Sequence, residues 1–102
     1  MATLTIVNPV AEPKADALSG GRFQPAKRSA SLDGKTVGLF WNAKAGGDVA
    51  LARTKENLAR LYPKATFVDI LAAHGSHMRQ ASKGQVEELS KRIHAIVGST
   101  SD

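Results

Sequence analysis

The sequence predicts an α/β fold in which three strands and two helices alternate along the chain. β-branched and aromatic residues form runs of strand length at residues 35–41, 66–71 and 94–98. The two segments between these runs place their apolar residues on one helical face. The order strand, helix, strand, helix, strand implies a parallel sheet with right-handed crossovers. We therefore expect a three-stranded parallel βαβαβ unit, which is half of a Rossmann-like fold.

The N-terminal segment, residues 1–31, differs from the remainder of the chain. Leu4, Ile6 and Val7 predict a short strand that the pair Asn8-Pro9 ends. The following residues, 11–31, contain two prolines, a Gly-Gly pair and several small polar side chains, which predict an irregular arm. A connection of this length is unusual inside a compact domain, and it either wraps around a partner or is mobile.

The second segment, residues 32–102, carries the predicted half-domain. Asp33-Gly34 is a turn signal before the first strand, and residues 42–48 form a flexible loop. Asp48 is a good N-cap for a helix over residues 49–61, with its leucines on one face. Tyr62-Pro63 ends this helix and leads to the second strand.

The last helix and strand follow a second polar loop at residues 72–83. A helix beginning near Gly84 is predicted from one apolar stripe: Val86, Leu89, Ile93 and Ile96. His94 begins the third strand at the end of this helix, where a cationic side chain suits the helix dipole. We expect His94 to be structural.

The composition is that of a small globular domain or a part of a larger one. Hydrophobic residues make up 42% of the 102 residues and charged residues 23%. The net charge of +5 is spread without a block of like charges, so nucleic acid is not the expected partner. Cysteine is absent, which excludes disulfides and a thiol nucleophile within these residues. No signal peptide or run of ~20 apolar residues is visible, and we expect a cytoplasmic protein without a membrane segment.

Sites in parallel sheets gather at the carboxyl ends of the strands, which directs attention to three loops. Amide, ammonium, guanidinium and hydroxyl groups in these loops are the expected substrate-binding set: Asn42, Lys44, Arg79, Ser99, Thr100 and Ser101. His74 and His77 are the catalytic candidates, because a histidine in such a loop can transfer a proton. A metal site would need further ligands that the loop lacks, so no metal is expected, and no cofactor is identified.

Four stretches carry a family resemblance: VNPVAEP near the start, LDGKTVGLFWNAKAGGD, LYPKA and HAIVGSTSD. Over residues 4–10 and 31–102 the chain resembles the UGSC-like family. In that family, a strand of this type leads through a small-residue loop, often with an aspartate, to a Cys- or selenocysteine-Gly-Ser-Cys motif. Asp102 stands where that aspartate would stand, and the motif itself is absent. The resemblance therefore implies an architecture but assigns the family's redox or nucleophilic chemistry to no residue here.

Two functions remain open from the sequence. The first is the small subunit, or N-terminal fragment of a processed precursor, of a heteromeric enzyme acting on a small molecule. A partner chain would complete the sheet and carry the reactive nucleophile or redox group, with redox, lyase and hydrolase chemistry unresolved. A separate subunit, proteolytic processing and truncation each explain where the sequence stops. The alternative is a non-enzymatic binding or regulatory module for an anionic ligand or an acidic protein partner.

Overall fold

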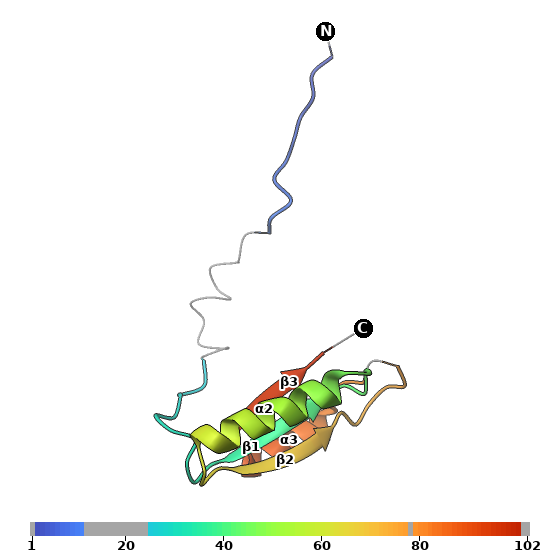
Figure 1. Cartoon of the computed structure of the whole chain (residues 1–102). Helices are drawn as coiled ribbons and strands as arrows, with labels where there is room; N and C mark the ends of the chain where they lie inside the picture. The colour runs from blue at the N-terminus through green and yellow to red at the C-terminus, as the bar shows by residue number, and fades with distance from the viewer. Residues whose placement is uncertain (1, 12–24, 78, 101–102) are drawn as a thin grey trace.

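The computed structural model describes residues 2–11, 25–77 and 79–100. Three strands and two helices alternate along the chain in the predicted order (Figure 1). In chain order they are β1 (Thr36–Trp41), α2 (Gly47–Leu61), β2 (Thr66–Leu71), α3 (Lys83–Arg92) and β3 (Ala95–Ser99). The predicted α/β class and the βαβαβ order are therefore confirmed.

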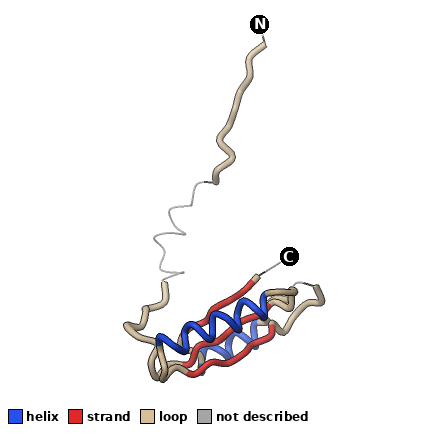
Figure 2. The backbone as a smooth tube through the Cα atoms, viewed as in Figure 1, coloured by secondary structure: helices blue, strands red, loops and turns tan. Residues whose placement is uncertain are grey.

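All three strands are parallel, and β1 lies between its two neighbours in the order β2-β1-β3. The crossover from β1 to β2 and the crossover from β2 to β3 run in opposite directions across the sheet. Because such crossovers are right-handed, the two helices must lie on opposite faces. Figures 1 and 2 show this arrangement, with α2 in front of the sheet and α3 behind it.

The core is built around β1, because this strand is covered on both faces and both edges. Val37 and Leu39 are almost completely buried on the face that α2 covers, where Leu51 of that helix is also buried. On the α3 face, a Cβ atom added to Gly38 would lie only 2.7 Å from Cδ1 of Ile70. Glycine in β1 thus allows the side chains of the neighbouring strands to close over the centre of the sheet.

The start of α2 differs from the prediction, because Asp48 is not its N-cap. Gly46 is the N-cap residue, with a φ of 89° and no side-chain hydrogen bond to the helix. Asp48 lies in the first turn instead, where its charge still favours the positive end of the helix dipole. The glycine pair shifts the helix start because Gly46 adopts a left-handed conformation that other residues rarely take.

The end of α3 also differs from the predicted apolar stripe. The helix ends at Arg92, so Ile93 is its C-cap and Ile96 belongs to β3. The chain changes from helix to strand at His94, which forms two hydrogen bonds with Thr36 of β1. Its N–H donates to the Thr36 carbonyl at 2.9 Å, and its Nδ1 accepts from the Thr36 N–H at 3.0 Å. His94 therefore has the expected structural role, which it fulfils through its hydrogen bonds with Thr36 of β1.

The strand predicted near Leu4 is not present, since residues 2–11 form neither helix nor strand. The side chains of Leu4, Ile6 and Val7 are about four-fifths exposed. The hydrogen bond here is local, from the Val10 N–H to Oδ1 of Asn8. A β-branched run becomes a strand only when a neighbour satisfies its backbone, which explains the wrong prediction. Residues 12–24 of the predicted arm lie outside the described residues.

No helix in the described part of the chain has the length and apolar character that crossing a membrane requires.

Candidate functional site

The carboxyl ends of the three strands lie at one end of the sheet, as they must in a parallel arrangement (Figure 1). From β1 the chain leaves toward α2 on one face, whereas the crossover that enters β3 comes from α3 on the other face. The helices that flank β1 and β3 thus lie on opposite faces of the sheet, which makes the gap between the ends of these two strands the topological switch point. In open α/β sheets, ligands bind in the crevice at this kind of switch point.

Hydrogen bonds fix the turn between β1 and α2 around Lys44. The carbonyl of Lys44 accepts from Nε1 of Trp41 at 2.7 Å and from the Gly47 N–H at 3.3 Å. The Lys44 N–H donates to Oδ1 of Asn42 at 3.2 Å. Lys44 is half-buried, and within the described residues its ammonium group forms no ion pair. The turn is thus held by its backbone, and the charge of Lys44 is not neutralised.

Asn42 is the buried polar residue of this turn, with only 3% of its surface exposed. Its Nδ2 atom is buried and has no hydrogen-bond partner among the described residues. Ala43 follows with a φ of 72°, a left-handed conformation that is unfavourable for a residue with a side chain. The turn therefore contains an unsatisfied donor beside a strained backbone position.

The end of β3 is joined to the start of α2 by a side chain. Oγ of Ser99 donates to the Gly47 carbonyl at 3.0 Å. A Cβ atom on Gly47 would lie 2.7 Å from this Oγ and 3.0 Å from the Trp41 ring, so only glycine fits without displacement. Thr100 follows β3 and is exposed, and Ser101 lies outside the described residues.

The loop after β2 reaches the same turn through Arg79. The Arg79 N–H donates to the Asn42 carbonyl at 3.0 Å, and its Nη1 donates to the Ala72 carbonyl at 3.4 Å. Of the substrate-binding candidates, Asn42, Lys44, Ser99 and Arg79 are therefore linked through backbone and side-chain hydrogen bonds.

The two catalytic candidates lie farther out in that loop. His74 is exposed and pairs through its backbone with Gln80. His77 is also exposed, and its Nδ1 lies 3.0 Å from Oγ of Ser76. No hydrogen bond joins either imidazole to Asn42 or Lys44 within the described residues. The described residues also contain no group of three or more metal-ligating side chains.

The roles of Trp41 and Gln85 in this region were not predicted from the sequence, and neither was the close contact at Gly47. Trp41 and Gly47 shape the first turn through the contacts given above. Gln85 of α3 reaches back to the end of β2, where its Nε2 donates to the Leu71 carbonyl at 2.8 Å and its Oε1 accepts from the Ala73 N–H at 3.0 Å. A glutamine in the first turn of a helix gives no sequence signal for such a contact, because the contact depends on tertiary packing.

An apolar groove of about 260 Å³ lies on the α3 face beside β3. Its lining includes Phe40 of β1, Val86 and Leu89 of α3, Ile93, and Ile96 of β3. Ile96 is 55% exposed and Val86 is 53% exposed. The α3 face of the sheet beside the start of β3 thus presents apolar side chains to solvent.

Comparison with known proteins gave one family. The model of the UGSC family matches residues 5–102, which is essentially the whole chain. Neither the curated proteins nor the solved structures contain a significant match.

Proposed function

Because the chain belongs to the UGSC family, we propose that it is one subunit of a heteromeric enzyme. It supplies the β2-β1-β3 sheet as half of a Rossmann-like unit and one wall of the active-site cleft. A partner chain completes the sheet along β3 and carries the reactive nucleophile or redox group.

The open side of β3 is the observation that carries this proposal. β3 pairs with β1 on one side, and among the described residues nothing pairs with its other side. A further crossover in the same direction as the one from β2 to β3 would place its helix on the α3 face. That position is the groove lined by Phe40, Ile93 and Ile96. The unpaired edge of β3 could therefore bind a further strand, and the apolar groove could bind the helix that precedes it.

The carboxyl ends of the strands at the switch point would bind a small-molecule substrate. Asn42, Lys44 and Arg79 supply amide, ammonium and guanidinium groups for binding. Hydroxyl groups come from the residues at the end of β3: Ser99, Thr100 and Ser101. His74 and His77 are the proton-transfer candidates of the neighbouring loop. Their exposure supports a role in which the partner chain covers the loop and brings substrate against it.

The test is to isolate the protein from its native source with its partner. We expect a second polypeptide to co-purify, and mass measurement and N-terminal sequencing identify it. Ile96→Lys places a charge in the groove beside β3 and should remove this polypeptide. Val49→Lys is the matched control, because Val49 is 69% exposed on α2, on the other face of the sheet.

A lone 10.8 kDa species would overturn the proposal and favour the module that binds an anionic ligand or an acidic protein. Retention of the partner by the Ile96→Lys variant would equally contradict assembly at β3. Loss of the partner from both variants would show that an added lysine disrupts assembly on either face of the sheet. The groove would then no longer be supported as the binding site of the partner.

A further inference from the structure

The carboxamide of Asn42 has a fixed orientation, and this orientation leaves a donor unused. Its Oδ1 accepts from the Lys44 N–H at 3.2 Å. Exchanging the oxygen and nitrogen of the amide would bring two donors together, so the unpartnered atom must be Nδ2. What Asn42 lacks is therefore an acceptor, and the group that satisfies it must present an oxygen or another lone pair.

The unsatisfied donor makes the turn energetically unfavourable as it stands. A buried donor without an acceptor has lost its hydrogen bonds to water and has gained none in the protein. The left-handed conformation of Ala43 adds a local conformational cost. Unsatisfied polar groups and strained backbone cluster at ligand sites, because the ligand or the surrounding structure supplies what the residue lacks.

The surrounding charges select the kind of acceptor. α2 is 15 residues long and directs the positive end of its dipole toward this turn. Lys44 adds a positive charge that no described acidic side chain neutralises. Asp48 is the acidic residue of the first turn of α2, and its side chain lines a different groove, next to Leu51 and Asp69. The turn thus favours a negatively charged oxygen.

We propose that the turn from β1 to α2 binds an oxyanion, which is the carboxylate or phosphate group of the substrate. Because Nδ2 of Asn42 is buried, the turn must shift to admit the anion. Nδ2 then donates a hydrogen bond to one oxygen, and Lys44 with the α2 N-terminus balances the charge. This assignment rests on the proposed function for its place in an enzyme cleft. The binding groups themselves all belong to this chain, so the anion site is testable without a partner.

The experiment is a titration of the full chain with inorganic phosphate and, separately, with acetate, followed by NMR at constant ionic strength. We expect saturable shifts of the Asn42 side-chain NH₂ resonances and of the backbone amides that begin α2. Phosphate and acetate separate the two ligand classes, because the proposed substrate group is the anion that saturates at the lower concentration.

Two variants and one control make the test specific. Asn42→Asp keeps an oxygen for the Lys44 N–H but loses the donor, so the affinity should fall at least tenfold. Lys44→Gln should weaken binding severalfold and serves as the second variant if Asn42→Asp does not fold. Lys91→Gln on the exposed side of α3 should leave the affinity unchanged.

The inference is overturned if the shifts grow linearly with both anions or if Asn42→Asp binds as tightly as the unaltered chain. Equal weakening by Lys91→Gln and Lys44→Gln would also contradict it, since general charge would then explain binding. None of these outcomes concerns assembly at β3. A failed anion site and a failed heteromeric enzyme are therefore distinguishable.

Discussion

Gly47 shows how much a single position determines at the start of α2. Its carbonyl accepts from Oγ of Ser99, and its missing side chain leaves room for the Trp41 ring. The contact therefore holds the end of β3, the end of β1 and the start of α2 together. The sequence predicted a flexible glycine loop here but not this close approach, because the approach depends on Ser99, which lies 52 residues away.

Gly47→Ala should lower the free energy of unfolding by about 1–3 kcal/mol, because the new Cβ would meet Ser99 Oγ at 2.7 Å and the Trp41 ring at 3.0 Å. Gly84→Ala is the matched control, since nothing lies within 4 Å of the added atom in α3. Alanine there should raise stability by up to about 1 kcal/mol. Urea unfolding of both variants measures the difference, and equal effects would contradict the proposed crowding at Gly47.

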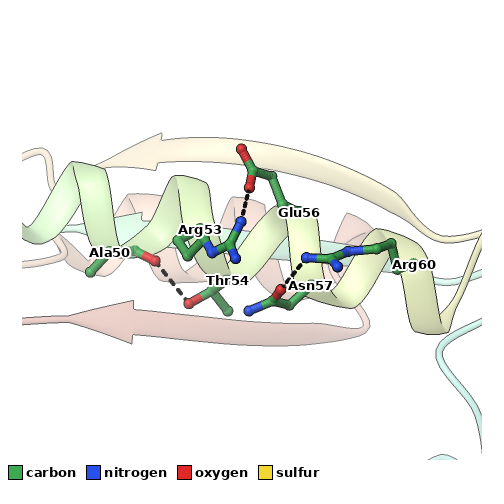
Figure 3. Close-up of polar contacts among 6 residues, drawn as sticks. All are labelled: Ala50, Arg53, Thr54, Glu56, Asn57 and Arg60. Atoms are coloured by element: carbon green, nitrogen blue, oxygen red, sulfur yellow. Dashed lines mark hydrogen bonds and ion pairs between the residues drawn. The ribbon is translucent and has the colours of Figure 1, made fainter.

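At the scale of elements, the two helices differ in how their N-terminal ends are capped. On α2, three polar contacts lie along the exposed surface: Arg53 with Glu56, Arg60 with Asn57, and Thr54 with the Ala50 carbonyl (Figure 3). α3 also carries exposed ion pairs, Lys83 with Glu87 and Arg92 with Glu88, but in addition it has a side-chain cap. Oγ of Ser82 accepts from the Gln85 N–H at 3.1 Å. A cap supplies a hydrogen-bond acceptor to a backbone N–H that has no partner within the helix. An exposed ion pair adds little stability, because both charges are well solvated without it.

Ser82→Ala should therefore destabilise the chain by about 1 kcal/mol through loss of the cap. Arg53→Ala should change stability by less than ~0.5 kcal/mol, since Arg53 and Glu56 are 67% and 62% exposed. Thermal unfolding of the two variants compares these effects directly. A larger loss with Arg53→Ala than with Ser82→Ala would show that the surface contacts, and not the cap, hold the helices.

The elements were predictable to different degrees, for physical reasons. β2 was predicted at its observed bounds because its run is β-branched and is bounded by Tyr62-Pro63 on one side and a polar loop on the other. The third strand was predicted at residues 94–98 and is found at Ala95–Ser99, but the apolar stripe of α3 was extended too far. Ile93 caps the helix and Ile96 belongs to β3, because apolar spacing continues across the boundary. The pairing of His94 with Thr36 decides that boundary, and it is a tertiary contact.

At the scale of the whole molecule, the sheet order is what places the candidate site. Local patterns predicted parallel strands, but the order β2-β1-β3 follows from which neighbours pack on β1. The sequence therefore pointed to Asn42, Lys44 and Ser99 as loop residues without showing that hydrogen bonds link them. The N-terminal strand failed as a prediction at this same scale, because propensity at residues 4–7 does not supply a neighbouring strand.

Deletion of residues 2–10 should leave the stability of the sheet unchanged. The described contacts of this stretch are local, and its apolar side chains are exposed. We expect the midpoint of thermal unfolding to shift by less than ~2 °C, since a change of 1 kcal/mol corresponds to roughly 4–8 °C at this size. Calorimetry of the shortened and full chains decides the point. A large decrease would mean that these residues pack against the domain in solution.

The central place of β1 has a consequence for synthesis on the ribosome. β1 emerges first of the three strands, yet one of its edges stays open until β3 is made. Thr36 and His94 are 58 residues apart, so their contact closes a long loop. Until then the run Val-Gly-Leu-Phe of β1 is available to other nascent chains. Late closure of this contact makes the unfinished chain more prone to aggregation than the finished one.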